Sequence, residues 1–551
     1  MSSTPSNTVL DPNRDARDAA LAAAREVHVE PTSVLGFQSA GRVLIIGPEA
    51  AGLAAAARLG EPLQGWLLVP GNGTGREIDG ITVSYSNGRD IELRGYLGAF
   101  QVVLRHGEEQ LDLGQALGLG DGVFDLVLDL HATPHFNQEL PPLGYYPASA
   151  DPARLDAALA ELPEIVGEFE KARFFHYDPD ICAHGNSQLQ GCTRCLEVCP
   201  TGAISSLVEK ISVDPYYCQG GGSCATACPS GAIIYSYPRP VDTLNRLRVL
   251  LRHYREAGGT DPVLIFHDGE AGSELLVALE TPLPGHAIPI EVEEVGAVGM
   301  DIWLAALAYG ARRVLLLRTP QLAPSVAREL DTQLGYARAL LAGMGYPGGV
   351  VDTLDDPTTV TDWLAMAMPD IRPAGFAGTN AKRDALFFAL DWLAREAPVK
   401  PPTNLELPTG APFGKIQVNR DACTLCMACV SVCPASALAD GGDKPQLNFL
   451  EANCVQCGLC ETACPENAID LYARFLFERE TRRQHRVLNE EAVFHCVSCG
   501  KPFATRSMIE GMTAKLRGHH MFQSDAALRR LQMCGDCRVQ AMFREEGGFP
   551  G

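Results

Sequence analysis

Two stretches of the sequence decide the fold around them, CTLCMACVSVCP (423–434) and CVQCGLCETACP (454–465). Both have the spacing C-x2-C-x2-C-x3-C-P, in which closely spaced thiolates surround a metal cluster and the proline ends the loop. Soft thiolates select zinc or iron–sulfur clusters, and this spacing with proline favours iron–sulfur over a pair of zinc knuckles. The sequence therefore predicts two [4Fe–4S] clusters in this region.

The fourth cysteine of each stretch is predicted to cross to the other cluster, as in the bacterial two-cluster ferredoxin pattern. We therefore expect residues 416–475 to form one small α+β ferredoxin-like module, called module 2, from two pseudo-duplicated halves. The two predicted ligand sets are Cys423, Cys426, Cys429 and Cys464, and Cys454, Cys457, Cys460 and Cys433.

A second cysteine-rich region, residues 178–240 (module 1), is expected to form another such unit but departs from the pattern twice. A nine-residue loop separates its first two cysteines, which is long enough to return Cys182 to the site. In its second half, CQGGGSCATACP (218–229), Gly221 stands where a second cysteine is expected. If the last cysteine of each half again joins the other cluster, the halves give two ligand sets. One has four thiolates, Cys182, Cys192, Cys195 and Cys228, and the other has three, Cys199, Cys218 and Cys224.

Three thiolates permit two kinds of cluster. One is a [3Fe–4S] cluster, and the other is a [4Fe–4S] cluster whose fourth iron takes water, Ser223 or a partner's ligand. The alternative without metal is that Gly221 replaces a lost ligand and the site is empty. We expect three [4Fe–4S] clusters and this fourth cluster, whose reduction potential should differ from the others because cluster type and charge set it.

The C-terminal segment, residues 476–551, carries two further CxxC pairs separated by a helical insert. Two such pairs usually form a tetrahedral S4 site, so we predict one structural zinc ion, with rubredoxin-like iron as the alternative. The nearby His495, His519 and His520 are expected to be surface residues, since four thiolates complete the shell. The predicted ligands are Cys496, Cys499, Cys534 and Cys537.

The rest of the chain has α/β character. Apolar strand-like runs alternate with amphipathic helical segments from about residue 245, which predicts parallel βαβ units. The expected fold class is thus multidomain α/β and α+β, with a Rossmann-like N-terminal unit and a central parallel domain. The predicted boundaries outside the cysteine-rich regions are a loosely attached polar and helical leader (1–40), a degenerate Rossmann-like unit (41–135), a connector (136–177), a parallel α/β domain (241–375), and a helix with a Pro-rich linker (376–415).

The segment RVLIIGPEAAGLAAAARL (42–59) has the strand–turn–helix context of a dinucleotide fingerprint. Against G-x-G-x-x-G it supplies Gly47 and Gly52 but has Glu49 at the central position, where a carboxylate would repel a pyrophosphate. We therefore predict a structural unit rather than a flavin or NAD site.

Composition limits the function further. The chain has 551 residues, of which 46% are hydrophobic and 20% charged, and this excludes wholesale disorder. Its net charge of −22 disfavours binding to nucleic acid or to an anionic membrane surface. We see no export signal and no apolar stretch long enough for a membrane span, which predicts a cytoplasmic protein. No arrangement of catalytic side chains stands out, so no catalytic residue is assigned.

The chain resembles the large bacterial 4Fe–4S ferredoxin-like proteins often encoded beside formate dehydrogenase. The resemblance rests on FEKARFFHYDPDICAHGNSQLQGCTRCLEVCPTGAI, VEEVGAVGMDIWLAALAYGARRVLLL, and CVSCGKPF with RLQMCGDCRV. The order of domains is more loosely similar to that of the flavin-binding chain of heterodisulfide reductase. This chain differs from it in two ways: Glu49 interrupts the flavin fingerprint, and residues 241–375 contain no cysteine.

These observations predict a multi-cluster iron–sulfur electron-transfer protein that exchanges electrons with a partner oxidoreductase. The resemblance implies formate dehydrogenase as that partner. Two alternatives stay open: a flavin-dependent electron-bifurcating oxidoreductase component, and an assembly or maturation factor for a metalloenzyme.

Overall fold

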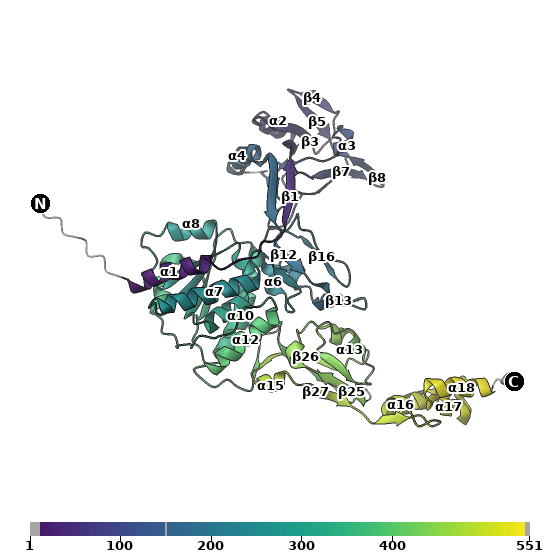
Figure 1. Ribbon diagram of the computed structural model, residues 1–551. Helices are drawn as coiled ribbons and strands as arrows, with labels where there is room; N and C mark the ends of the chain where they lie inside the picture. The colour runs from purple at the N-terminus through teal and green to yellow at the C-terminus, as the bar shows by residue number, and fades with distance from the viewer. Residues whose placement is uncertain (1–10, 149–150, 443, 546–551) are drawn as a thin grey trace.

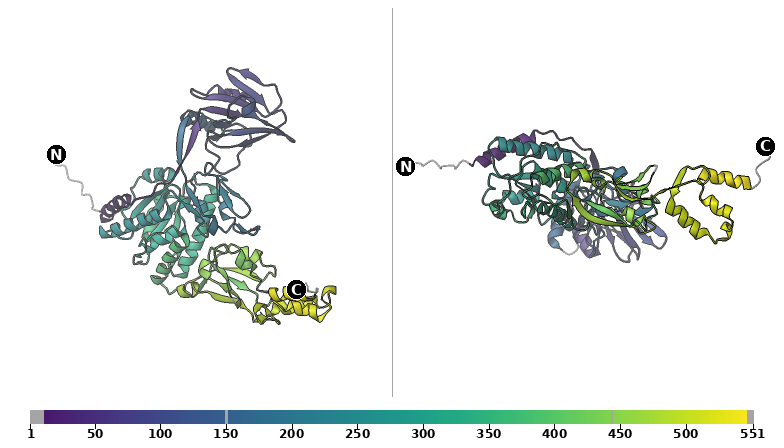
Figure 2. Two further views of the ribbon diagram at one scale, coloured as in Figure 1. Left: turned by 45° about the vertical axis from the view of Figure 1, so that its right-hand side comes forward. Right: turned by 90° about the horizontal axis from the view of Figure 1, so that it is seen from below.

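The computed structural model describes residues 11–148, 151–442 and 444–545, so the first ten residues of the predicted leader and the last six of the chain lie outside the described residues. Figure 1 shows an N-terminal unit held away from a central α/β domain by a two-stranded ribbon. Module 1, the central domain and module 2 lie side by side. In the view from below in Figure 2, the C-terminal helices extend beyond module 2.

The N-terminal unit contains a six-stranded sheet in the order β10-β9-β2-β3-β5-β4, which is parallel except for the pairing of β4 with β5. A separate antiparallel sheet packs beside it. The elements are β2 (Arg42–Ile46), α2 (Glu49–Ala56), β3 (Gln64–Val69), β4 (Arg76–Ile78), β5 (Ile81–Tyr85), β9 (Leu126–Asp129) and β10 (Tyr145–Pro147), with β6 (Asp90–Arg94), β7 (Gln101–His106), β8 (Glu109–Asp112) and α3 (Leu113–Ala116) in the second layer.

The predicted connector is largely part of this unit. Its strand β10 pairs with β9, and its helix α4 (Pro152–Glu161) buries Ala158 and Leu159 in the same core as β2. The ribbon consists of β1 (Val34–Ser39) paired antiparallel with β11 (Gly167–Ala172). Proline-rich composition suggested a linker here, whereas long-range strand pairing makes most of the segment structural.

The central domain contains a four-stranded sheet in the order β19-β18-β20-β21, with all three pairings parallel. The helix α9 (Met300–Ala308) is buried over its whole length because it packs between the sheet and the helices α7 and α12. The elements are α7 (Pro240–Glu256), β18 (Val263–Asp268), α8 (Ala271–Val277), β19 (Ala287–Val292), η3 (Val295–Ala297), β20 (Arg313–Leu317), α10 (Pro324–Gly343), β21 (Val351–Leu354), α11 (Val360–Ala365) and α12 (Lys382–Arg395).

The leader helix α1 (Pro12–Arg25) is docked on the central domain, contrary to the loose attachment expected from sequence. Its stripe of Ala16, Ala20 and Ala24 is buried against α7. Arg17 donates to the backbone carbonyls of Leu283, Pro284 and Ala287. A small-residue stripe is weakly hydrophobic, so its partner helix became evident only in the tertiary structure.

Each cysteine-rich region forms a compact unit of short antiparallel strands and single-turn helices, and both units extend beyond their predicted limits. Module 1 includes β12, and module 2 includes β22 from the predicted linker and β27 from the predicted tail. Module 1 comprises β12 (Phe175–Tyr177), β13 (Gly185–Asn186), β14 (Leu189–Gln190), α5 (Arg194–Glu197), β15 (Ile204–Ser206), β16 (Ile211–Val213), α6 (Ser223–Ala227) and β17 (Ile233–Tyr235). Module 2 comprises β22 (Asn404–Glu406), β23 (Gly414–Val418), α13 (Ala428–Ser431), β24 (Leu438–Gly441), β25 (Lys444–Phe449), α14 (Leu459–Thr462), β26 (Ile469–Leu476) and β27 (Arg486–Glu490).

The tail begins with a hairpin and continues as three helices. Its elements are β28 (Val493–His495), β29 (Pro502–Thr505), α16 (Arg506–Leu516), α17 (Asp525–Leu531) and α18 (Gly535–Glu545). Across the described ranges, none of the helices combines the length and the apolar character needed to cross a membrane.

Candidate metal centres

The cysteine loops repeat one backbone conformation. The residue three positions after the last cysteine of each unit has a positive φ in all four units: Gly202, Gly231, Ser436 and Asn467. In module 2 the residues flanking the second cysteine of each stretch are left-handed as well: Leu425 and Met427, and Gln456 and Gly458. These turns direct successive cysteines of a loop toward one point.

Three of the predicted four-cysteine sets each line a small cavity. The residues therefore fit a multinuclear cluster, because four thiols from two different loops surround a common space. The three sets are Cys182, Cys192, Cys195 and Cys228; Cys423, Cys426, Cys429 and Cys464; and Cys433, Cys454, Cys457 and Cys460.

The thiols within a set are close enough to influence one another electrostatically. Burial, together with the charges of the neighbouring Cys423, Cys426 and Cys464, raises the pKa of Cys429 to about 12. Such thiols are protonated at neutral pH in the absence of metal, whereas a coordinating thiol is deprotonated. Metal binding at these buried sites therefore displaces protons.

The remaining cysteines of module 1, Cys199, Cys218 and Cys224, form the predicted three-thiol group. Burial raises the pKa of Cys224 well above its usual value, and the charges of Cys218 and Cys199 act in the same direction. Lys171 donates to the carbonyl of Cys218 at 2.8 Å and fixes the loop on β11.

Gly221 occupies the structural position of a second cysteine in this group. Gly220 (φ 85°) and Gly222 (φ 68°) repeat the left-handed conformations that flank the second cysteine in module 2. At Gly222 a Cβ atom would approach the Cα of Ala297 to 2.3 Å, so this glycine is required, whereas a Cβ at Gly221 has Pro200 as its nearest contact, at 3.6 Å. The loop has the same left-handed positions as the cysteine loops of module 2 although it lacks one thiol.

The two modules meet through their cysteine loops. The thiol of Cys457 in module 2 has a raised pKa. Burial is the main cause, and the charges of Cys454, Cys433 and Cys192 act in the same direction, so Cys192 of module 1 lies close to Cys457. Beside them, a Cβ at Gly191 would approach Cγ of the buried Leu459 to 2.7 Å. One four-thiol set of each module therefore faces the other module.

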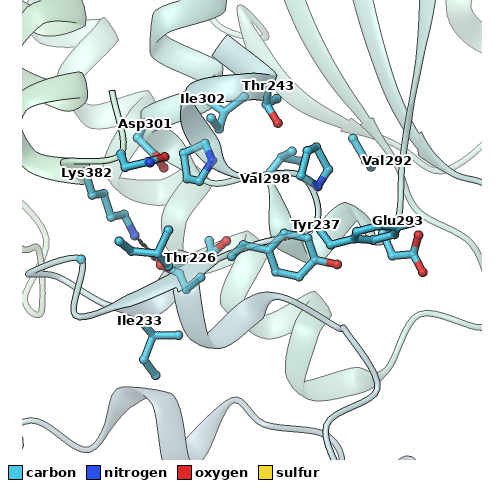
Figure 3. A pocket seen from close by; sticks show the side chains of 18 residues that line it. Thr226, Ile233, Tyr237, Thr243, Val292, Glu293, Val298, Asp301, Ile302 and Lys382 are labelled. Atoms are coloured by element: carbon cyan, nitrogen blue, oxygen red, sulfur yellow. Dashed lines mark hydrogen bonds between the residues drawn. The ribbon is translucent and has the colours of Figure 1, made fainter. Parts of the chain in front are cut away.

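Two consecutive basic residues at the start of α12 join both modules. Lys382 donates to the carbonyls of Ala225, Thr226 and Cys228 in module 1 at 2.6–3.0 Å, and Figure 3 shows its side chain extended toward Thr226. The neighbouring Arg383 turns to module 2.

Arg383 donates to the carbonyls of Pro412, Ala452 and Cys454 at 2.8–3.1 Å. Burial lowers the pKa of Arg383 to about 10, and the thiol of Cys454 acts in the opposite direction. Sequence reasoning missed this pair. The only signal was two adjacent basic residues at the start of an amphipathic helix.

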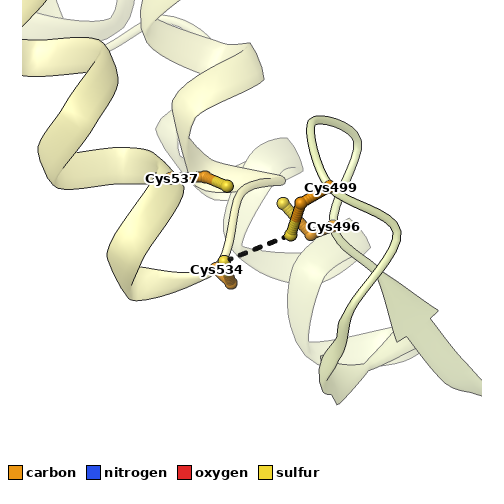
Figure 4. Close-up of side chains that lie close together, drawn as sticks. All are labelled: Cys496, Cys499, Cys534 and Cys537. Atoms are coloured by element: carbon orange, nitrogen blue, oxygen red, sulfur yellow. Dashed lines mark hydrogen bonds between the residues drawn. The ribbon is translucent and has the colours of Figure 1, made fainter.

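The four tail cysteines lie close together, as Figure 4 shows. All four sulfur atoms are within 4.8 Å of one another, and in the described part of the chain this is the one such group of three or more candidate ligands. Thiolates 2.3 Å from a tetrahedral ion lie about 3.8 Å apart, and the sulfur atoms of Cys499 and Cys534 are 3.7 Å apart. Burial opposes ionisation of Cys496, but N–H groups of Cys534, Cys499 and Ser498 lower its pKa to about 6. The geometry suits a single ion, and the three nearby histidines are exposed.

In the N-terminal unit, the three fingerprint positions serve packing and ion pairing. Glu49 accepts a hydrogen bond from Tyr85 at 2.6 Å and forms an ion pair with Arg76. A Cβ at Gly52 would lie 2.3 Å from Cδ1 of Leu67, and one at Gly47 2.7 Å from Cβ of Leu130. These contacts support the structural interpretation of the turn.

Comparison with known families matches both modules. A family described as "4Fe-4S dicluster domain" matches residues 417–469, and a second family with this description matches residues 190–232. A "4Fe-4S binding domain" family matches residues 174–204. The cysteine-rich regions are therefore 4Fe–4S ferredoxin-like domains.

Two curated relatives match short parts of the chain. Hydrogenase-4 component A of Escherichia coli is 39% identical over 64 residues, which is 12% of this chain and 29% of the relative. Ferredoxin-1 of Caulobacter vibrioides is 44% identical over 54 residues, which is 9% of this chain and 43% of the relative. The chain thus covers less than half of the length of either relative.

Proposed function

We propose that this multi-cluster ferredoxin-like protein is an electron carrier that relays electrons between a partner oxidoreductase at one end of a row of clusters and a second redox site at the other. The family matches in both modules support iron–sulfur clusters as the carriers. The hydrogenase component among its relatives supports an oxidoreductase as the class of partner.

The observation that carries this proposal is the contact between the two cysteine-rich modules. The set containing Cys192 faces the set containing Cys457, with no intervening domain. Within each module the two sets share loops, since the last cysteine of one unit joins the other set. The resulting order of the cysteine sets is the three-thiol group of module 1, the Cys192 set of module 1, the Cys454 set of module 2 and the Cys423 set of module 2.

We assign a cluster type to each cysteine set from the number of thiols in the set. The three sets of four thiols would hold [4Fe–4S] clusters, and the three-thiol group a [3Fe–4S] or an open [4Fe–4S] cluster. The tail group would hold zinc and serve structure. Formate dehydrogenase is the partner that the sequence resemblance favours, and a cytoplasmic location agrees with the iron–sulfur ligands.

Anaerobic purification followed by metal and sulfide analysis tests the cluster assignment. We expect about 15 or 16 iron atoms per chain, three clusters of four and one of three or four, with one zinc. EPR of the dithionite-reduced protein should show signals broadened by interaction between neighbouring clusters. Colourless, iron-free protein, or reduced clusters with no mutual broadening, would contradict a relay.

The partner is tested separately by anaerobic mixing. Reduced formate dehydrogenase should bleach the visible absorption of the clusters within seconds, and an apo form of this chain should not oxidise it. Reduction by other oxidoreductases but not by formate dehydrogenase would leave the relay intact and reject this partner.

A further inference from the structure

A large cleft lies between module 1 and the central domain. Its volume is about 1130 Å³. One wall is formed by α1 and α7, with Arg25 and Arg246, and the floor by the ends of the central strands. The end wall belongs to module 1 and includes Pro200, Gln219 and Gly221.

The floor of this cleft coincides with the topological switch point of the parallel sheet. The chain leaves β18 toward β19 on one side and leaves β20 toward β21 on the other, so the two connections diverge. Open parallel sheets bind ligands in the crevice at this point, outside the carboxyl ends of the strands. His267 and Asp268 of β18, with Leu317 at the end of β20 and Thr319 after it, line the cleft there.

The end wall of the cleft is formed by the loops that hold the three-thiol group, since Pro200, Gln219 and Gly221 line it. The short helix η3 packs directly on its loop, since a Cβ at Gly296 would approach the carbonyl oxygen of Gly221 to 2.5 Å. Thr226 donates to the carbonyl of Gly296 at 2.7 Å. Gly221 itself lines the cleft, and a Cβ at this position would point toward Pro200, another lining residue, so the corner without a thiol borders the cleft.

The cleft is acidic where it approaches this corner. Tyr235, whose hydroxyl donates to the carbonyl of Gly220 at 3.0 Å, experiences the charges of both Glu293 and Glu294 and of the thiols of Cys218 and Cys224. Four glutamates line the floor, and none forms an ion pair or a side-chain hydrogen bond with any described residue: Glu270, Glu291, Glu293 and Glu294. Unpaired carboxylates of one sign raise the local concentration of cations.

We propose that this cleft binds a small organic cation that reaches the three-thiol cluster at its Gly221 corner. The inference rests on the proposed function, because it requires that the group holds a [4Fe–4S] cluster with an open iron. It makes this end of the relay a ligand-binding end and leaves module 2 to face the partner. The chemical class is a molecule with a protonated amine and a donor atom for iron.

Three small thiols of similar length test the proposal: 2-aminoethanethiol (cationic), 2-mercaptoethanol (neutral) and 3-mercaptopropionate (anionic). Each is titrated anaerobically into the reduced full-length protein, and the change in the EPR signal is followed against the concentration of thiolate. We expect the cationic thiol to reach half-saturation at about tenfold lower concentration than the anionic one, as attraction by several carboxylates requires.

Variants locate the effect. Gly221→Cys, for which there is room, should supply the fourth thiolate and abolish the response to all three probes, whereas Gly221→Ala should keep it. The double variant Glu293→Gln, Glu294→Gln should remove the preference for the cation. Glu280→Gln, at an exposed residue outside the cleft, is the matched control and should leave the preference unchanged.

Two results would overturn the proposal. One is the absence of any probe-dependent EPR change, as a [3Fe–4S] cluster or a protein-docking groove would give. The other is equal half-saturation by the three thiols. Iron and sulfide analysis of the same samples separates either result from failure of the relay, since intact clusters that bind no probe leave the relay standing.

Discussion

Single residues at motif positions separate binding loops from structural ones. At Gly221 the flanking glycines keep the left-handed conformations of a complete cysteine loop, so the backbone is suited to a cluster although one ligand is absent. At Glu49 the opposite holds. The strand–turn–helix is present, but Arg76 and Tyr85 engage the carboxylate at the central position of the fingerprint.

Gly52→Ala tests the structural interpretation of that turn. The added methyl group would meet Leu67, and overpacking of this kind costs about 1–3 kcal/mol. We expect the N-terminal unit to unfold at a lower urea concentration, as measured by tryptophan fluorescence. The cofactor content of the protein should be unchanged. Gly60→Ala, where no atom lies within 4 Å of the new Cβ, should have little effect. Loss of a bound flavin in Gly52→Ala would instead favour a nucleotide site.

Glu294 should make stability depend on pH. Burial, with the charges of Asp268, Glu293 and Glu270, raises its pKa to about 7. The unfolded chain therefore loses this proton at lower pH than the folded chain, and wild-type stability falls as pH rises from about 4.5 to 7. We expect the difference in denaturant midpoint between Glu294→Gln and wild type to increase in favour of the variant as pH rises to about 7. Above this pH the difference should stay constant. A constant difference from about pH 4.5 to 7 would contradict the raised pKa.

At the scale of elements, the N-terminus of α12 orders the two modules around the central domain. Lys382 and Arg383 are adjacent in sequence, yet each serves a different cysteine loop. Arg482, fully buried between Phe387 and Phe475, pairs with Asp391 and further holds α12 against module 2.

Lys382→Met and Arg383→Met should destabilise different modules. Each change leaves three backbone carbonyls without a donor, and one unsatisfied buried acceptor costs about 1–3 kcal/mol. We expect iron release to an anaerobic chelator to become about tenfold faster, from module 1 in Lys382→Met and from module 2 in Arg383→Met. Lys400→Met, at an exposed position, serves as the control. Equal release from both modules in either variant would argue against this division.

At the scale of the whole molecule, the cysteine sets form a row across two modules that are far apart in sequence. Residues 241–415 lie between them in the chain, yet module 1 and module 2 touch at the loops of Cys192 and Cys457. The N-terminal unit is joined to this body by the β1–β11 ribbon, and the tail extends from the opposite side (Figure 1).

Leu459→Ala should weaken the coupling between the modules. The side chain is fully buried and faces Gly191 of module 1, and a Leu→Ala change at such a site costs about 2–5 kcal/mol. We expect less mutual broadening of the EPR signals of the reduced clusters, with unchanged iron content. Leu476→Ala, buried in β26 of module 2 and outside the cysteine loops, is the matched control and should keep the broadening. If the broadening is unchanged in Leu459→Ala, the contact between module 1 and module 2 does not depend on this side chain.

Sequence patterns predicted well those features that depend on residues close together in the chain. The alternating strands and helices from β18 to β21 agree with the parallel βαβ units expected from short apolar runs and amphipathic segments. Domain limits were predicted less well. The segments around β10 and β22 are proline-rich and resemble linkers, but each contains a strand that pairs with a distant one.

The sequence by itself determined that the two cysteine-rich regions are 4Fe–4S ferredoxin-like domains, because this pattern depends on residue type and on spacings of two or three positions that a single loop enforces. Only the tertiary structure decided which cysteine sets face each other, that Lys382 and Arg383 hold both modules, and that the Gly221 corner opens into an acidic cleft. These relations join segments far apart in the chain, and Cys192 and Cys457 are 265 residues apart. They arise from packing between surfaces whose individual residues carry no local pattern.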